Sequence, residues 1–484
     1  MSRMMTTLFA ALAATATGAA HAQAPAPKPA KDWQVPDRPE IRRILVQRID
    51  EQHQARGIVV GLVDASGRRV VSYGVRDQGD NRPLDGRSMF ELGSMTKVFT
   101  SLILADMAEH REVRLDDPVA KYLPAASKVP ERGGKQITLI DLATHTSGLP
   151  RLAANMSPKD LANPYADYTD QQLLQFLAGY QLPRDIGAQY EYSNLGGGLL
   201  GYALSRRTGM GYEALVKQRI TRPLNMRSTS ITLTPDQKAR LEKGHDASLR
   251  PVANWDFQDA TAGAGALRSD ADDILTLLEA EIGFGSKALA PAMQDQLKPR
   301  RPTGIPNTEI ALAWHITTTP KGPIVWHNGG TGGYRTIMAF DPKARVGVVV
   351  LADTETLAGV DDIAFHILAG TPLAQPPGPP KPPVLRHEIP VDAEVMRGLA
   401  GHYQLTPQLI AEVTVQDGQM FIQLTGQGKA PVYFEGPNRV FWKVVDAQAN
   451  FETDADGHGV AMVLHQSGQT LRAPRLKDEL EPGR

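Results

Sequence analysis

Residues 90–97 read Phe-Glu-Leu-Gly-Ser-Met-Thr-Lys, and a helical pattern begins within this stretch. Val98, Leu102 and Ala105 follow at the spacing that places apolar side chains on one buried face of a helix. The sequence Ser-x-x-Lys therefore stands at the start of a helix that packs into a core.

Ser94 and Lys97 have the spacing of a nucleophile and its base. Residues three apart lie side by side on a helix, so the Lys97 amine can reach the Ser94 hydroxyl. A serine hydroxyl is a poor nucleophile without an adjacent base, and lysine can be that base when burial lowers its pKa. A helix start also offers free N–H groups to a developing oxyanion. Alone, the spacing is common by chance and is better explained by a capping serine followed by an exposed lysine.

A second motif, Tyr192-Ser193-Asn194, lies in the loop-like stretch QYEYSNLGGG. A tyrosine hydroxyl near a lysine can act as the acid or base for a leaving group, and the Asn194 amide can donate to a substrate carbonyl. Tyr190 is a rival for the tyrosine role. Ordinary turn residues are the simpler explanation of this motif.

A third motif, residues 327–333, reads His-Asn-Gly-Gly-Thr-Gly-Gly and precedes the last predicted strand pair. Gly329 and Gly330 let a substrate backbone lie against a strand edge, and the Gly330 N–H is a candidate second oxyanion donor. As a phosphate loop the run is weak, because no Lys-Ser/Thr follows it. The simpler explanation of His327 is a histidine of the core.

Strand signals stand at both ends of this region. Residues 58–63 and 69–73 form one predicted hairpin, and residues 335–340 and 346–351 form another. The chain between them is mostly helical and loop-like. This order predicts an α/β fold (α+β) in which one sheet is closed by the two ends of the domain and a helical subdomain is inserted.

The C-terminal segment has a different character. Apolar residues alternate with polar ones on either side of Asp417-Gly418, which is a strong hairpin signal, and Asp456-Gly457 marks another turn. A small all-β domain is therefore predicted. The predicted organisation is a signal peptide (1–22), a Pro/Ala-rich tether (23–39), a catalytic domain (40–371), a Pro-rich linker (372–384) and the β domain (385–484).

The three motifs in this order resemble the class C β-lactamase-like branch of the penicillin-recognising serine hydrolases, which includes D-Ala-D-Ala carboxypeptidases, D-aminopeptidases and esterases. Two further segments strengthen the resemblance, which covers about residues 40 to 370. They are the LATHTSGLP stretch at 142–150 and the RPLNM stretch at 222–226. The resemblance implies a β-lactamase/transpeptidase-like antiparallel sheet, and the C-terminal domain resembles the lipocalin-like β domains appended to some peptidases of this group.

By that resemblance, Ser94 is acylated, Lys97 and Tyr192 transfer protons, Asn194 orients the substrate, and His327 lines the far wall of the site. The third motif departs from the Lys-Thr-Gly of many β-lactamases. At an ordinary pKa near 6.5, His327 would be charged below about pH 6 and neutral above about pH 7.5. Its grip on a substrate carboxylate is therefore expected to weaken as pH rises.

Composition and the N-terminal sequence limit the partners that the protein can bind and indicate the compartment in which it works. The 484 residues include 52 Lys and Arg against 53 Asp and Glu, so there is no basic excess for nucleic acid. A charged start, an apolar stretch and Ala20-His21-Ala22 indicate an export signal cleaved after Ala22, and no later run is long enough to span a membrane. Cysteine is absent and the twelve histidines lack metal-ligand spacing, so no metal or cofactor is expected.

The sequence thus predicts a periplasmic or secreted serine hydrolase that forms an acyl-enzyme on Ser94 with β-lactams, D-Ala-D-Ala peptides or both. One alternative is an esterase, D-amino-acid amidase or aminopeptidase that uses the same site. Another is a penicillin sensor that is acylated without turnover. A nucleophilic role for Ser147 is weak, because no base stands one helical turn away.

Overall fold

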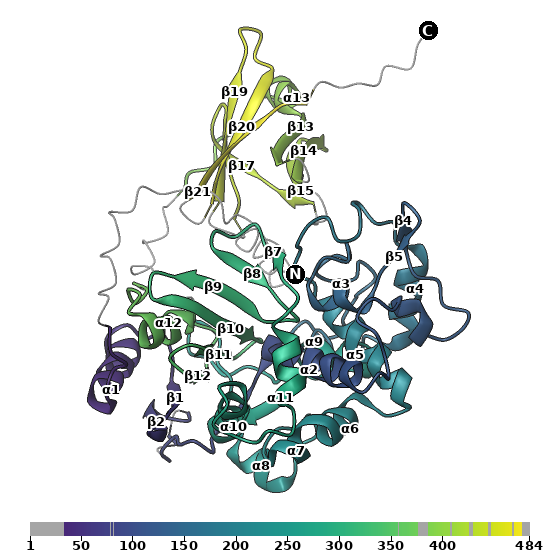
Figure 1. The fold of residues 1–484 in the computed structure, drawn as a ribbon. Helices are drawn as coiled ribbons and strands as arrows, with labels where there is room; N and C mark the ends of the chain where they lie inside the picture. Colours follow the sequence, from purple (N-terminus) through teal and green to yellow (C-terminus); the bar gives the residue numbers. More distant parts are fainter. Residues whose placement is uncertain are drawn as a thin grey trace. The chain divides into compact units, whose positions relative to one another are not determined.

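The strand pairs predicted near the two ends of the catalytic region join in one sheet. The computed structural model describes residues 33–476 except 78, 81, 357, 376–385, 407–408, 425–428, 444–446 and 467–468. Its largest sheet is antiparallel and has the order β2-β1-β12-β11-β10-β9-β8-β7 (Figure 1). In that order the strands are Gly67–Gly74, Gly57–Asp64, Val346–Ala352, Arg335–Asp341, Gly322–Gly330, His315–Thr319, Thr308–Ile310 and Arg301–Pro302.

The central strands of this sheet are buried on both faces. In β12, Val348 and Val350 pack into one cluster, while Val349 and Leu351 pack into the other. Successive strand residues point to opposite faces, so burial on both sides produces the continuous apolar sequence of β12. Helices α1 (Arg38–Val46) and α12 (Asp361–Ala369) cover the first face (Figure 1).

The helices on the other face of the sheet include the predicted core helix. It is α2 (Thr96–Glu109), and it contacts α5, α9 and α11. The remaining helices of this unit are α3 (Leu139–Ala143), α4 (Asp170–Gly179), α5 (Asn194–Thr208), α6 (Tyr212–Val216), α7 (Arg222–Leu224), α8 (Pro235–Arg240), α9 (Asp259–Gly265), α10 (Ala271–Glu281) and α11 (Ala290–Gln296). The expected mixed fold, an antiparallel sheet with inserted helices, is confirmed.

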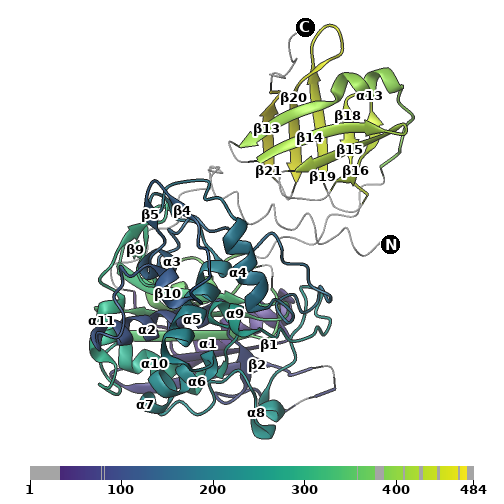
Figure 2. The same ribbon diagram turned by 90° about the vertical axis from the view of Figure 1, so that its right-hand side faces the viewer.

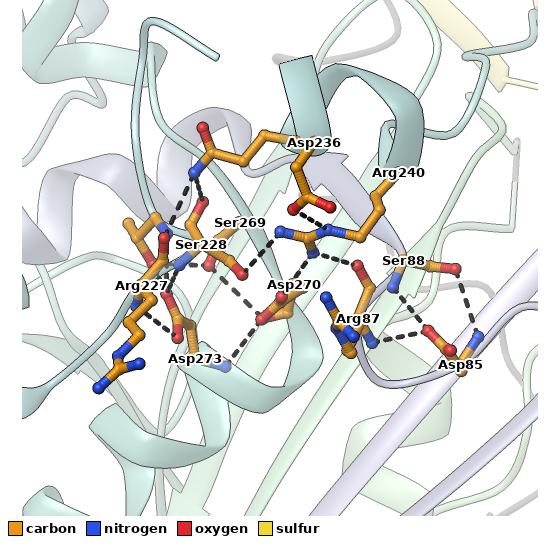
Figure 3. A network of polar contacts seen from close by, with 12 residues as sticks. Asp85, Arg87, Ser88, Arg227, Ser228, Asp236, Arg240, Ser269, Asp270 and Asp273 are labelled. Atoms are coloured by element: carbon orange, nitrogen blue, oxygen red, sulfur yellow. Dashed lines mark hydrogen bonds and ion pairs between the residues drawn. The ribbon is translucent and has the colours of Figure 1, made fainter. Parts of the chain in front are cut away.

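A buried carboxylate network ties the segment after RPLNM to α10 (Figure 3). The Asp273 carboxylate accepts the backbone N–H groups of Arg227, Ser228 and Thr229 at 3.0, 2.7 and 2.8 Å, and the Thr229 hydroxyl at 2.8 Å. Asp270 caps the start of α10 by accepting the Asp273 N–H at 2.9 Å. These bonds satisfy N–H groups of a loop and a helix end that would otherwise be left without partners.

The C-terminal unit contains two further antiparallel sheets (Figure 2). The first consists of β13 (Gly401–Thr406), β14 (Leu409–Gln416), β15 (Gln419–Leu424) and β16 (Ala430–Pro431). The second consists of β17 (Tyr433–Gly436), β18 (Arg439–Phe441), β19 (Ala447–Thr453), β20 (Gly459–Gln466) and β21 (Gln469–Pro474), and the unit also contains helix α13 (Ala393–Leu399). The predicted turn joins β14 to β15, and Asp417 and Gly418 both have positive φ, as a type I′ turn requires.

The described residues fall into two compact units, one before residue 378 and one after it. The predicted signal peptide, most of the tether, and residues 376–384 of the predicted linker lie outside the described residues. Those boundaries remain predictions. Over the described part of the chain, no helix combines the length and the apolar character needed to cross a bilayer.

Candidate active site

Ser94 lies in a single 3-10 turn, Gly93–Met95, directly before α2. Every residue from Ser88 to Met107 is buried except Ser94, which is partly exposed. Ser94 is therefore the point at which this core segment can meet a substrate.

The Lys97 amine is surrounded by three oxygen atoms. It lies 3.0 Å from Ser94 Oγ, 2.9 Å from Asn194 Oδ1 and 2.8 Å from the Ala264 carbonyl oxygen. A neutral amine has two N–H groups and one lone pair. The amide and carbonyl oxygens can only accept, so the two N–H groups bond to them and the lone pair faces the Ser94 hydroxyl. This geometry suits removal of the Ser94 proton.

The electrostatic environment of Lys97 favours the neutral amine. Burial holds the pKa of Lys97 well below its ordinary value of 10.5, and the charge of Arg151 acts in the same direction. No carboxylate forms an ion pair with Lys97 among the described residues to reverse this shift. Lys97 can thus accept a proton, which a lysine with an ordinary pKa does poorly near neutral pH.

Tyr192 lies between several groups of the site. Its ring centre is 4.8 Å from Lys97 Nζ and 4.5 Å from the His145 ring centre. Burial raises the pKa of the Tyr192 phenol well above its ordinary value of 10, while a hydrogen bond with Ser94 acts in the opposite sense. Tyr192 is therefore a phenol near neutral pH, able to donate a proton. Its rival Tyr190 has its hydroxyl 3.0 Å from His315 Nε2 instead.

Asn194 is held at the first position of α5. Ser193 caps this helix by accepting the Gly196 N–H at 2.8 Å, which fixes the turn between Tyr192 and Asn194. The Asn194 side chain bonds to Lys97 through Oδ1, and its Nδ2 donates to the Tyr165 hydroxyl at 3.0 Å. The amide thus lies beside the Ser94–Lys97 pair.

A loop at residues 144–151 supports the Tyr192–Asn194 motif. The backbone N–H of Ser193 donates to His145 Nδ1 at 3.2 Å, and its hydroxyl donates to the Pro150 carbonyl at 2.6 Å. The Arg151 carbonyl accepts the Asn194 N–H at 3.0 Å. The THTSGLP segment was recognised only as a family match, and its contacts with the second motif arise between residues far apart in sequence.

The third motif meets the Ser94 turn at the end of β10. A side chain on Gly329 would approach the Leu92 carbonyl oxygen to 1.9 Å, and one on Gly93 would approach the Gly330 nitrogen to 2.7 Å. Gly93 also has a φ of +53°, which glycine adopts without strain. The absence of side chains lets the Gly330 backbone lie against the turn that contains Ser94.

His327 differs from the expectation. It is fully buried, and burial above all holds the pKa of His327 well below its ordinary value of 6.5. The expectation that it becomes charged below about pH 6 is therefore wrong. Its Nδ1 lies 2.6 Å from the Asn328 carbonyl oxygen. The neutral ring donates there, and its Nε2 is an acceptor without a partner among the described residues.

Two more buried histidines border the site. His315 stacks on Trp326, and burial lowers the pKa of His315 to about 4. The pKa of His145 is also well below its ordinary range, again chiefly through burial. The imidazoles that line the site are therefore neutral.

Among the described residues, no group of three or more histidine, cysteine or carboxylate side chains is arranged to hold a metal ion.

The Ser147 hydroxyl stays within the 144–151 loop. It is buried and accepts the Leu149 N–H at 3.3 Å. The structure thus groups Ser94, Lys97, Tyr192 and Asn194, with His327 at 6.3 Å from Tyr192 between ring centres. Sequence reasoning missed His145 and Arg151; the only available signal was that both lie in or directly after a stretch already matched to the family.

Two curated relatives show which kind of protein this chain is similar to. The D-alanyl-D-alanine-carboxypeptidase/endopeptidase AmpH of Escherichia coli K12 is 29% identical over 344 residues, covering 66% of this chain and 87% of its own. Penicillin-binding protein 4* of Bacillus subtilis is 26% identical over 458 residues, covering 90% of this chain and 98% of its own. The latter match extends well beyond the catalytic region.

Solved structures show the same fold. A β-lactamase/D-alanine carboxypeptidase from Yersinia pestis has a TM-score of 0.56 and 27% identity, with 65% of this chain and 92% of the other covered. A class C β-lactamase from Rhodobacter sphaeroides gives the same TM-score and identity, with 65% and 94% covered. Residues 385–478 match a domain of unknown function, DUF3471. The β-lactamase family model matches residues 42–371, and the chain belongs to this family of serine hydrolases.

Proposed function

We propose that the chain hydrolyses D-Ala-ended peptides and reacts with β-lactams through an acyl-enzyme on Ser94. The observation that carries this proposal is the Lys97 amine, 3.0 Å from Ser94 Oγ and with a strongly lowered pKa. The named activities of two relatives, a D-alanyl-D-alanine-carboxypeptidase/endopeptidase and a penicillin-binding protein, support the substrate class.

In the proposed acylation step, Ser94 Oγ attacks the substrate carbonyl carbon while its proton passes to Lys97 Nζ. The backbone N–H groups of Ser94 and Gly330 bind the oxyanion that forms. The carbon–nitrogen bond then breaks, and the leaving nitrogen receives a proton from the Tyr192 phenol, which regains one from Lys97. Water hydrolyses the ester in a second step by the same groups, which releases the acid and restores Ser94.

An esterase is a second candidate function. The observation that favours it is the neutral His327, because this position of the third motif supplies no cation for a substrate carboxylate. An uncharged ester requires no such cation, and the acylation chemistry at Ser94 would be unchanged.

One set of assays separates these functions. D-Ala release from a D-Ala-D-Ala-ended peptide, hydrolysis of a neutral aryl ester and the lifetime of a penicillin adduct are measured on the same preparation. We expect D-Ala release and a penicillin adduct. Ester hydrolysis without either would favour the esterase, and a stable adduct without D-Ala release would favour the penicillin sensor.

We also propose that the chain is exported and that the proline-rich residues 372–384 link two domains. The charge, apolar stretch and Ala-x-Ala order of residues 1–22 supports export. Mass determination of the secreted protein would give the cleavage position, which we expect after Ala22.

A further inference from the structure

The proposed substrates carry a carboxylate, but the third motif provides no cation to bind it. The neutral His327 ring presents Nε2 as a hydrogen-bond acceptor, which repels rather than attracts a carboxylate oxygen. Lys97 is also unsuited to that task, because its base role requires a neutral amine. A carboxylate-specific site would therefore need another cation near Ser94.

Arg151 lies close enough to this site to supply the charge. It ends the loop that supports the second motif, and its carbonyl accepts the N–H groups of Asn194 and Leu195 at 3.0 and 3.2 Å. Its guanidinium carbon is 5.3 Å from the centre of the Tyr192 ring, and Lys97 Nζ is 4.8 Å from the same centre. Arg151 is exposed, whereas Lys97 is buried. The guanidinium thus lies where the site meets solvent.

Arg151 has no carboxylate partner within ion-pair distance among the described residues, unlike the arginines that stabilise this unit. Arg335, the cross-strand partner of Gly330, is paired with Glu355 at 3.0 Å, and Arg268 is paired with Glu91 at 3.2 Å. The Arg151 guanidinium is positively charged, so it repels Lys97 whenever the Lys97 amine is protonated. The free guanidinium can offer two parallel N–H groups to an incoming carboxylate.

We infer that Arg151 is a specificity-determining residue that binds a carboxylate of the substrate at the solvent-exposed edge of the Ser94 site. The inference rests on the proposed function and names its substrate class: peptides or other acyl donors that carry a carboxylate. Two sources of the carboxylate have the same chemistry: the terminal carboxylate of the leaving D-Ala, and a side-chain carboxylate on the acyl part. Both would form the same fork-shaped contact with the guanidinium.

The test compares Arg151→Gln and Arg151→Lys with the parent protein, using Arg206→Gln as the matched control. Arg206, in the last turn of α5, is also exposed, and its guanidinium carbon lies 6.0 Å from the centre of the Tyr202 ring. Each variant is assayed with three substrates: a D-Ala-D-Ala peptide, the same peptide with a glutamate in the acyl part and an amidated C-terminus, and a neutral ester. Values of kcat/KM are taken on the pH plateau of each variant, because removing Arg151 also removes a charge that acts on Lys97.

We expect Arg151→Gln to lower kcat/KM for one or both anionic substrates by about tenfold to a hundredfold, with little change for the ester. Arg151→Lys should recover part of the loss, and Arg206→Gln should match the parent. The anionic substrate that responds identifies the source of the carboxylate. Equal losses for all three substrates, or no loss for any, would overturn the inference.

A failure of the proposed function is distinguishable from a failure of this inference. If the parent hydrolyses neither peptide, with or without activity on the ester, the proposed function is wrong and the inference falls with it. If the parent hydrolyses the peptides and Arg151→Gln does so equally well, only the inference is wrong. A selective loss in Arg335→Gln instead would assign the carboxylate to Arg335, the cross-strand partner of Gly330, and would also overturn the inference.

Discussion

The two units of the chain use their interiors differently. Among the described residues, every buried polar or charged side chain, tyrosine and tryptophan apart, lies at or before Thr356, in the catalytic unit. The interior of the C-terminal unit is instead packed with apolar and aromatic side chains such as Tyr403, Met420 and Leu464. Burying polar groups costs free energy unless they are paired.

The difference locates the chemistry of the molecule. In the catalytic unit, Lys97 and His327 are buried with shifted pKa values, and buried ring nitrogens of His145 and His327 lack protein partners in the described structure. Such groups gather at functional sites, where burial adjusts their proton affinity. The core of the C-terminal unit stabilises its own fold. Among its described residues, that core contains no buried lysine, histidine or carboxylate side chain.

The largest effect is expected from Lys97→Arg. Guanidinium remains protonated and cannot accept the Ser94 proton, so acylation by a penicillin should slow by about a thousandfold or more. The rate of adduct formation measures this directly, with thermal unfolding as the control for folding. Acylation at the parental rate would show that Lys97 is only a structural cation. The buried titratable groups would then no longer distinguish the catalytic unit as the place of the chemistry.

A stability comparison comes next. Asp273→Ala leaves three backbone N–H groups and the Thr229 hydroxyl without their acceptor, and should cost about 3 to 5 kcal/mol of unfolding free energy in the catalytic unit. Glu452→Ala in the C-terminal unit breaks only an exposed pair with Arg472, so its unfolding midpoint should hardly move. Denaturant unfolding of both variants checks this; similar midpoints would contradict it.

The sequence predicted the local parts of this picture well. Alternating apolar residues predicted the hairpin at Asp417-Gly418, and the strand signals at residues 335–340 and 346–351 predicted the pair β11 and β12. The Thr-rich strand β9 and the two short strands beyond it in the sheet, β8 and β7, were not predicted, because their largely polar sequences lack such signals. The low pKa of His327 was missed for a different reason: its neighbours come from segments distant in sequence, and only their packing lowers that pKa.

A smaller effect is expected from removing the C-terminal unit. A chain ending at Leu373 retains all three motifs, and the described residues before and after residue 378 form separate compact units. Its rate of acylation by a penicillin should therefore remain within about threefold of the full chain, as expected for a domain with its own core. Loss of folding or of acylation in the truncated chain would show that the C-terminal unit completes the site.

The smallest effect concerns pH. His327 is neutral throughout the range from pH 6 to 8 because its pKa lies well below 6.5, so its charge should not change there. The ratio of kcat/KM for a D-Ala-D-Ala peptide to that for a neutral ester should thus vary by less than about twofold over this range. Dividing by the ester removes the shared effect of Lys97. A ratio that falls several-fold as pH rises would mean that His327 is protonated at pH 6.

The central claim is that Ser94 is the residue acylated. Mass spectrometry of the parent protein at successive times after addition of a penicillin, followed by peptide mapping, tests it most directly. We predict one added penicillin mass, located on the peptide that contains Ser94, and no adduct in Ser94→Ala, while Ser147→Ala is acylated like the parent. An adduct that persists in Ser94→Ala, or that maps to another serine, would contradict the account.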